Sequence, residues 1–286
     1  YGDSPYASFS TFAGNPLMID LENLSERGWA KPESILPPDY IKNYGPVDFG
    51  SVVWWKIPVL KQSAEYFLAN ANESDMKSFV DFKKDNAEWL DNYSVFMSIK
   101  EFYDAKAQQE NVFGAMWSNY WPQDLASNNK KAVSNWINEH SKEIEIHKVI
   151  QFFFFTQWKN LKEYANSKGI SIIGDIPIFV AADSADVWAN QKLFQLDKTG
   201  KSIAVAGVPP DYFSATGQLW GNPLYDWVAM KKDGYQWWVE RIKALLNLVD
   251  YIRIDHFRGF EAYWSVPAGE ETAVNGKWVP GPDHDL

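Results

Sequence analysis

The spacing of apolar residues predicts helices over much of the first half of the chain. From about residue 54 to residue 106, large apolar side chains recur at intervals of three and four positions, as on one face of an amphipathic helix. Two stripes carry this spacing: Phe79, Phe82, Trp89 and Leu90, and then Phe96, Ile99, Phe102 and Tyr103. We therefore predict an all-helical subdomain of roughly fifty residues.

A second helical block follows Pro122, and its apolar positions continue through Trp136 and Val149 to Ala165. At residues 168–169 a lysine precedes a glycine, a pair typical of a helix C-terminus. In residues 1–50, by contrast, proline or glycine interrupts each short apolar stretch, which predicts loops. Within them, residues 17–19 (LMI) are a candidate strand.

Two short β-type segments each follow a helix. Residues 170–177 (ISIIGDIP) are rich in β-branched side chains and end in an abrupt turn, which predicts a buried strand. A helix predicted over residues 235–248 leads into a second strand at residues 249–255 (VDYIRID). One face of that helix carries Trp238, Ile242, Leu245 and Leu246. Repeats of a helix followed by a strand are typical of parallel α/β folds, and α/β is the fold class we predict.

Both predicted strands deliver an acidic residue to their carboxyl ends, where parallel α/β folds carry their chemistry. Asp175 ends the first and Asp255 the second, although an aspartate there also serves as a turn former or helix cap. Because side chains alternate along a strand, Arg253 and Asp255 point to the same face, which we expect to be interior.

A guanidinium within about 4–6 Å lowers a carboxyl pKa by roughly one to three units. Such a carboxylate suits a nucleophile or an electrostatic stabiliser, whereas a general acid must keep its proton. The alternative is a buried structural ion pair between Arg253 and Asp255. The residues that follow, 256–260 (HFRGF), favour the chemical interpretation because they add an imidazole, a second cation and a glycine.

Hydrolysis or transfer of a glycoside needs two carboxyl groups, about 5–5.5 Å apart when the configuration is retained. Asp255 would attack the anomeric carbon, and a second, protonated acid would serve the leaving oxygen. The candidates for this second acid are Asp175, Asp211, Glu261, Glu270 and Glu271. None of them has a convincing position in the sequence.

The composition points to a sugar ligand and against several other classes. Aromatic residues make up 16% of the 286 residues, with 15 Trp and 14 Tyr, and many stand beside Asn, Gly and Pro. Rings of this kind stack on sugars, although each one is more often a core residue. The net charge of −10 and a pI near 4.9, without a basic block, exclude nucleic acid as the expected partner.

The longest apolar run, residues 152–155, is too short to cross a membrane, so we expect a soluble protein. The absence of cysteine excludes disulfides and thiolate metal sites, and four histidines leave little for a zinc centre. We therefore expect no metal and no cofactor. A reducing cytosol is compatible with this composition, and we expect a cytoplasmic location.

Residues 253–260 (RIDHFRGF) resemble the nucleophile strand of the 4-alpha-glucanotransferases, also called amylomaltases or disproportionating enzymes, which form glycoside hydrolase family 77. The resemblance spans essentially the whole chain. Further matches are residues 174–181 (GDIPIFVA) to an earlier strand motif, 207–214 (GVPPDYFS) and 217–223 (GQLWGNP) to the acceptor-covering loop, and 4–6 (SPY) and 10–16 (STFAGNP) to opening motifs.

The resemblance implies that Asp255 is the nucleophile that forms a covalent β-glucosyl intermediate and that Arg253 orients it. Asp175 and His256 would bind hydroxyls of the donor sugar, and Tyr6 would lie on the donor side. The loop that places the acceptor would be lined by Asp211, Tyr212, Phe213, Gln218 and Trp220. The implied partners are α-1,4-glucans such as maltooligosaccharides, starch and dextrins, and the implied reaction passes a glycosyl group to the 4-hydroxyl of another glucan. A flexible lid bearing aromatic rings would favour transfer over hydrolysis by excluding water.

The implied fold is a (β/α)8 TIM barrel of the α-amylase type, incomplete here, with a large helical insert. We expect three parts: a barrel-associated loop region (1–55), a helical insert with the preceding barrel helix (56–168), and barrel strands with active-site loops (169–286). About 170 residues lie outside the insert, fewer than the ~250 of a complete barrel. No stretch matches the family's acid/base glutamate or its third acidic residue, so we expect a central fragment that is inactive alone.

Two alternatives stay open on the sequence. One is a non-catalytic glucan-binding module, in which aromatic side chains bind starch or maltodextrin. The other is an α-amylase-like hydrolase, which the same nucleophile would permit. Calcium would be the usual companion of the hydrolase, yet the sequence has no dense oxygen-ligand loop for it.

Overall fold

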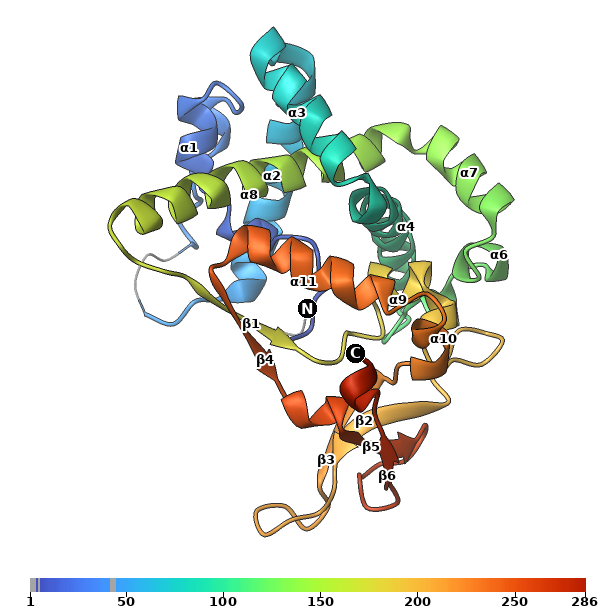
Figure 1. Ribbon diagram of the computed structural model, residues 1–286. Coiled ribbons are helices and arrows are strands. Elements are labelled where there is room, and N and C mark those ends of the chain that lie inside the picture. The colour runs from blue at the N-terminus through green and yellow to red at the C-terminus, as the bar shows by residue number, and fades with distance from the viewer. Residues whose placement is uncertain (1–3, 5, 42–44) are drawn as a thin grey trace. The chain divides into compact units, whose positions relative to one another are not determined.

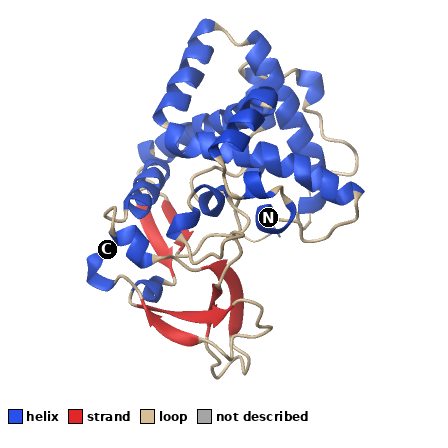
Figure 2. Cartoon of the chain, turned by 90° about the vertical axis from the view of Figure 1, so that its right-hand side faces the viewer, coloured by secondary structure: helices blue, strands red, loops and turns tan. Residues whose placement is uncertain are grey.

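A computed structural model describes residues 4, 6–41 and 45–286 and separates the chain into two units (Figures 1 and 2). The helical unit consists of Ala13–Ser98 and Trp136–Ile170. The mixed unit, which contains helices and strands, consists of Tyr1–Phe12, Ile99–Asn135 and Ser171–Leu286. Gly2, Asp3 and Pro5, which precede or belong to the opening motif, lie outside the described residues.

The predicted helices between residues 54 and 106 are confirmed. The helices that lie in the helical unit, wholly or in part, are α1 (Leu21–Glu26), α2 (Phe49–Asn70), α3 (Glu73–Asp85), α4 (Ala87–Gln109), α7 (Lys130–Glu139) and α8 (Ser141–Ser167). The first predicted stripe is divided between two helices because α3 ends at Asp85 and α4 starts at Ala87. The helix stop at residues 168–169 is also confirmed, since α8 ends at Ser167 and Gly169 has a φ of +73°.

The candidate strand at residues 17–19 was wrong. Pro16–Met18 forms a short 3-10 helix, and a second one covers Pro32–Ser34. The side chain of Asn15 accepts a hydrogen bond from the Leu17 N–H, and Pro16 occupies the first turn, where its fixed φ suits a helix. A local cap therefore outweighs the β preference of three apolar residues.

Aromatic rings fill the core of the helical unit. Trp29 stacks on Phe153 with ring centroids 5.4 Å apart, and Phe67 meets Phe79 edge to face at 5.8 Å. Many of the aromatic residues are therefore core residues, as we expected for most individual rings. The Gln151 carboxamide bonds both the N–H and the C=O of the buried Gly14, at 2.8 and 3.1 Å.

The mixed unit contains the predicted pair of parallel strands, β1 (Ile173–Pro177) and β4 (Tyr251–Asp255). Their register places Asp175 opposite Arg253 and Pro177 opposite Asp255. The first strand is only partly buried, in contrast to the expectation, because Ile173 is 70% exposed while Ile176 is buried. The helix before β4 is confirmed as α11 (Gln236–Leu248), although its buried residues are Trp237, Trp238 and Arg241, and Leu246 is exposed.

A second, antiparallel sheet was not predicted. Its order is β3-β2-β5-β6, built from β2 (Ala204–Val208), β3 (Gln218–Pro223), β5 (Ala262–Pro267) and β6 (Lys277–Pro280). The remaining short helices of this unit are α5 (Trp117–Tyr120), α6 (Gln123–Ala126), α9 (Ala185–Ala189), α10 (Trp227–Lys231) and the 3-10 helices Gln191–Leu193, Phe257–Phe260 and Asp283–Asp285. The residues expected to form the acceptor loop are therefore a β2–β3 hairpin.

The buried guanidinium of Arg241 on α11 holds the carboxyl end of β1 in place. It donates to the carbonyl oxygens of Pro177 and Ile178, at 2.7 and 3.1 Å, and to the Thr11 hydroxyl at 2.7 Å. Charge-assisted bonds of this kind are roughly twice as strong as neutral ones. A single side chain thus ties the strand end to the segment that contains Thr11.

Asp186 on α9 completes this network. Its Oδ2 accepts the Thr11 N–H at 2.7 Å, and its carboxyl group is buried. Burial raises the pKa of Asp186 from 3.8 to about 6, against the lowering effects of the Thr11 N–H and of Arg241.

This raised pKa predicts a specific pH dependence of stability. Because the folded chain binds the Asp186 proton more tightly than the unfolded chain does, this group's contribution is complete below about pH 4 and is lost as the pH rises to about 6. We expect the loss to be about 3 kcal/mol. Replacement of Asp186 by Asn keeps an oxygen acceptor for Thr11 and removes the titration.

Urea unfolding of the wild type and of Asp186→Asn, measured between about pH 4 and pH 7, checks the prediction. The difference between the two free energies of unfolding should shift against the wild type as the pH rises. Parallel pH profiles would show that Asp186 does not titrate in this range.

Candidate active site

Three polar side chains meet at the paired strands β1 and β4. Arg253 donates two hydrogen bonds to Asp175, from Nε to Oδ1 at 2.9 Å and from Nη2 to Oδ2 at 2.6 Å. The Tyr6 hydroxyl donates to the same Oδ2 at 3.2 Å. Hydrogen bonds from Arg253 hold the pKa of Asp175 below its ordinary value, and the negative charge of Asp175 raises the pKa of Tyr6. The site thus contains a fixed carboxylate with a tyrosine O–H beside it.

The direct partner of Arg253 differs from the expected one. Because side chains alternate along a strand, we expected Arg253 to pair with Asp255. Both hydrogen bonds of the guanidinium instead run to Asp175. Register partners on adjacent strands are about 4.8 Å apart, but residues i and i+2 on one strand are about 6.6 Å apart, so the cross-strand carboxylate is the nearer one. The expected interior position is also wrong for this chain, since the Arg253 side chain is 63% exposed.

Asp255 is the last residue of β4 and is half-buried. Because side chains alternate, it points to the same face as Arg253 and hence as Asp175. The negative charge of Asp255 is one of the smaller causes that raise the pKa values of Tyr6 and Arg253. A carboxylate that lies near this cluster without the guanidinium clamp keeps its oxygens available for another partner.

His256 follows in an unusual backbone conformation. Its φ of +53° is left-handed, which turns the chain sharply after β4. Its Nε2 is buried, and no hydrogen bond within the described part of the chain reaches it. Burial lowers the pKa of His256, so the ring is neutral at pH 7 and offers one donor and one acceptor nitrogen. Trp220 packs edge to face on the ring, with centroids 5.0 Å apart.

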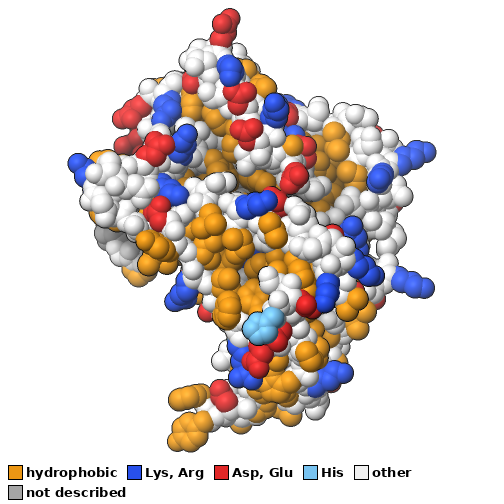
Figure 3. Space-filling model, in the orientation of Figure 1, with side chains coloured by type: hydrophobic (Ala, Val, Ile, Leu, Met, Phe, Trp, Pro, Cys, Tyr) orange, Lys and Arg blue, Asp and Glu red, His pale blue; other side chains and the backbone are white. Residues whose placement is uncertain are grey.

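The β2–β3 hairpin carries the residues expected to bind an acceptor. Asp211 folds back on its own turn, where Oδ1 accepts the N–H groups of Phe213 and Ser214 at 2.9 and 2.8 Å. This turn presents Tyr212 and Phe213, whose side chains are 95% and 92% exposed. Their rings pack edge to face, with centroids 5.6 Å apart. Figure 3 shows hydrophobic side chains protruding at this end of the unit. Asp211 therefore shapes the tip, and the two rings are its exposed surface.

The other end of the hairpin lies close to His256. Trp220 donates its indole N–H to Gln218 Oε1 at 3.0 Å, so the two side chains form one pair. The Asn222 side chain donates to the Val180 carbonyl at 2.9 Å, which anchors the hairpin to the segment after β1. The structure thus connects Gln218 and Trp220 with His256, while Tyr212 and Phe213 contact one another at the tip.

Sequence reasoning missed Arg241, Thr11 and Asp186, which position the end of β1. The helical periodicity of residues 235–248 drew attention to apolar positions, and an arginine there looks like a solvated residue. One signal was present: Arg241 follows two tryptophans at helical spacing, and its guanidinium lies over Trp237 and Trp238, 5.5 and 4.8 Å from the ring centroids.

Three of the candidates for a second, protonated acid, Asp175, Asp211 and Glu270, have hydrogen-bond partners within the described part of the chain. Arg253 keeps Asp175 ionised, and Asp211 is committed to its turn. Glu270 accepts a hydrogen bond from the Asn275 side chain at 2.8 Å on the β5–β6 connection. Among the described residues, no three His, Cys, Asp or Glu side chains gather as metal ligands, and no helix is both long and apolar enough to cross a membrane.

Comparison with known proteins identifies relatives along the entire chain. A family model described as 4-alpha-glucanotransferase, glycoside hydrolase family 77, matches residues 1–286. The chain is 44% identical over 287 residues to the 4-alpha-glucanotransferase of Streptococcus pneumoniae serotype 4, covering 100% of this chain and 54% of that protein. It is 45% identical over 286 residues to the Thermus thermophilus protein of the same name, again covering 100% and 54%. The chain spans about half the length of the curated relatives it matches.

Comparison with solved structures also identifies members of this family. The amylomaltase from Streptococcus agalactiae, solved in complex with acarbose, is 37% identical and superposes with a TM-score of 0.91 over 100% of this chain and 55% of that one. The amylomaltase from Corynebacterium glutamicum, at 19% identity and a TM-score of 0.71 over 98% of this chain and 36% of that one, shares the fold. The chain therefore belongs to glycoside hydrolase family 77, the family of the 4-alpha-glucanotransferases, as its motifs had indicated.

Proposed function

We propose that the whole protein is a 4-alpha-glucanotransferase that moves α-1,4-glucan segments between maltooligosaccharides by a retaining double displacement. The observation that carries the proposal is the cluster at the strand ends, where Asp175 and Arg253 are clamped together and Asp255 lies on the same face. Family membership, and the acarbose bound to the Streptococcus agalactiae relative, support a glucan as the substrate class.

In this proposal Asp255 attacks C1 of the donor sugar, and the bond to the leaving glucan breaks as the covalent glucosyl–Asp255 bond forms. The 4-hydroxyl of a second glucan then attacks the same carbon, the glucosyl–Asp255 bond breaks to restore the carboxylate, and the hydroxyl proton passes to the residue that gave up its proton in the first step. Asp255 suits this role because both guanidinium hydrogen bonds of Arg253 run to Asp175, which leaves the Asp255 oxygens available to the donor sugar. The acid that protonates the leaving oxygen is expected outside this chain.

Asp175 and His256 would bind hydroxyls of the donor sugar. An ionised carboxylate accepts hydrogen bonds from two vicinal hydroxyls, and the neutral imidazole adds one ring nitrogen. Tyr6 would flank the donor because its hydroxyl already reaches Asp175. Arg253 would act by orientation, since it fixes the plane of the Asp175 carboxylate and contributes positive charge beside Asp255.

Tyr212 and Phe213 would cover the acceptor sugar together with Gln218 and Trp220. The hairpin gives a physical reason for transfer over hydrolysis, because two fully exposed rings on one turn offer an apolar surface to an incoming glucan. A sugar stacked there occupies the space from which water would attack.

The remaining proposals concern architecture. The parallel pair β1–β4, each preceded by a helix, supports two adjacent strands of a (β/α)8 barrel of the α-amylase type, and the helical insert and the division into residues 1–55, 56–168 and 169–286 are proposed with it. In such a barrel, catalytic residues come from the carboxyl ends of several different strands. A cytoplasmic location is proposed with this role.

The main test is transfer by the full-length gene product. With maltotriose as the sole substrate, we expect glucose and longer oligosaccharides, and Asp255→Asn should reduce transfer by about 10³-fold or more because a carboxamide is not a nucleophile. Asp81→Asn, a matched change at an exposed surface pair on α3, should leave the rate unchanged. Products of hydrolysis alone, or an active Asp255→Asn variant, would contradict the proposal.

A second prediction concerns the hairpin tip. The double variant Tyr212→Ala/Phe213→Ala removes the stacking surface, so we expect transfer to fall about tenfold and the hydrolysed fraction to rise. Transfer conserves the number of reducing ends and hydrolysis increases it, so a reducing-end assay beside chromatography of the products measures the ratio. Phe113→Ala, which removes another ring that is 94% exposed in the same unit, is the control.

A third prediction concerns Arg241 as a positioning residue. In Arg241→Lys a single ammonium replaces a guanidinium that bonds two carbonyls and Thr11, so the end of β1 and Asp175 should shift. A displacement of about 1 Å costs up to 10²-fold, and we expect kcat/KM to fall by about that factor. Thr11→Val removes one of the three bonds and should have a smaller effect.

A thermal melt of Arg241→Lys separates positioning from unfolding. The variant should remain folded at the assay temperature, with a weaker affinity for acarbose. A folded variant with wild-type kcat/KM and acarbose affinity would show that Arg241 does not position the site.

A further inference from the structure

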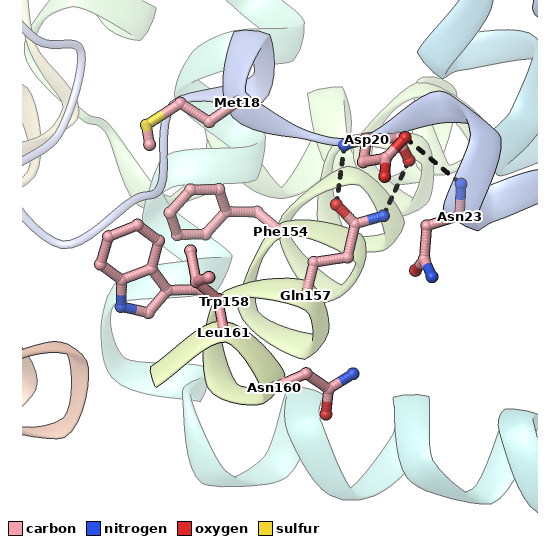
Figure 4. A pocket seen from close by; sticks show the side chains of 8 residues that line it. All are labelled: Met18, Asp20, Asn23, Phe154, Gln157, Trp158, Asn160 and Leu161. Carbon is pink, nitrogen blue, oxygen red and sulfur yellow. Dashed lines mark hydrogen bonds between the residues drawn. The ribbon is translucent and has the colours of Figure 1, made fainter. Parts of the chain in front are cut away.

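The helical unit contains a pocket that takes no part in the proposed chemistry. Its volume is about 290 Å³, and the residues that line it come from α8 and from the segment that contains the 3-10 helix Pro16–Met18 and α1 (Figure 4). Pockets that bind small molecules begin at about this size. The pocket is therefore large enough for a sugar ring.

One side of the pocket is apolar. The rings of Phe154 and Trp158 lie nearly parallel, with an interplanar angle of 9° and centroids 5.9 Å apart. Met18 and Leu161 add apolar surface beside them and are 59% and 53% exposed. Figure 4 shows the buried Phe154 ring beside Trp158, so the two rings together form the apolar side.

The opposite side is polar, as Figure 4 shows, and it is held rigid by hydrogen bonds. The Gln157 carboxamide bonds both the N–H and the C=O of Asp20, each at 2.8 Å. Oδ1 of Asp20 caps α1 by accepting the N–H groups of Glu22 and Asn23, at 2.9 and 3.3 Å. The backbone of this wall is therefore fixed before any ligand arrives.

Three polar groups of the wall keep hydrogen-bonding capacity. No hydrogen bond within the described part of the chain involves Oδ2 of Asp20, Nδ2 of Asn23 or the carboxamide of Asn160. The Asp20 oxygen is an acceptor, the Asn23 nitrogen is a donor, and the Asn160 carboxamide offers both. Such a mixture matches hydroxyl groups, which both donate and accept.

The lining excludes other ligand classes. Asp20 is the only charged side chain among the described residues that line the pocket, so a phosphate or carboxylate would meet a negative charge there, and the nearby Lys56 ammonium already donates to the Leu17 carbonyl at 2.7 Å. A metal ion would find a single carboxylate where several ligands are needed. A neutral, hydroxyl-rich ring with an apolar face matches both the apolar and the polar side of the pocket.

We propose that this pocket is an accessory site that binds a glucosyl unit of an α-1,4-glucan, with one face of the sugar against Trp158 and its hydroxyls toward Asp20, Asn23 and Asn160. The choice of glucan rests on the proposed function, which supplies the substrate class. Binding a distant part of a long chain here would raise the affinity for polymers without affecting short substrates.

Affinity electrophoresis of the full-length gene product in gels containing amylopectin tests the site. The background variant Asp255→Asn prevents turnover of the polymer. In that background, Trp158→Ala should raise the apparent dissociation constant for amylopectin about tenfold, because the stacking surface is lost. Asn160→Arg should do the same by filling the pocket, and since Asn160 is exposed, this variant keeps the test valid if Trp158→Ala does not fold.

Tyr164→Ala is the matched control, because Tyr164 is an exposed ring on the same helix outside the pocket. Without the Asp255→Asn change, Asn160→Arg should keep wild-type kcat/KM for maltotriose. Unchanged amylopectin affinity in both pocket variants would overturn the proposal even if the enzyme transfers glucan. Loss of affinity in both variants would support the site even if no transfer were detected, so the two proposals fail separately.

Discussion

The ion pair between Asp175 and Arg253 is the interaction on which the site depends. It joins β1 and β4 at register partners, so it fixes both the Asp175 carboxylate, which we propose binds the donor, and the strand that carries Asp255. Both side chains are partly exposed, and exposed pairs add little to stability. We infer that the pair mainly orients the carboxylate, and that the stability of the strand end comes from the buried Arg241 beneath it.

The sequence was sufficient for the parallel strands, for most of the long helices and for the family. Alternation along VDYIRID placed Arg253 and Asp255 on one face, but it carried no information on register, and so it could not show that Asp175 is nearer to the guanidinium. The antiparallel sheet escaped prediction because β2 and β3 contain Gly207, Gly221 and Pro223 in place of a regular apolar alternation. The strand register and the antiparallel sheet depend on pairing between residues far apart in sequence, which a local pattern does not contain.

Two features depend on contacts between distant segments, which a local sequence pattern does not give. Arg241 acts through carbonyl groups more than sixty positions earlier, and its burial among tryptophans reverses the usual expectation for an arginine. The pocket of the helical unit forms only when the segment around Asp20 meets α8, through the reciprocal bonds with Gln157. In both places, buried or reciprocal hydrogen bonds fix a stretch of backbone, and polar groups that we propose bind ligand lie beside it.

The most direct test of the central claim is to trap the intermediate. The full-length protein would be incubated with a maltosyl fluoride whose terminal 4-hydroxyl has been removed, so that the donor cannot serve as an acceptor, and then digested for mass spectrometry. We expect a glycosyl group attached to the peptide that contains Asp255, and no such label in Asp255→Asn. A label on another carboxylate, or turnover without any covalent adduct on Asp255, would contradict it.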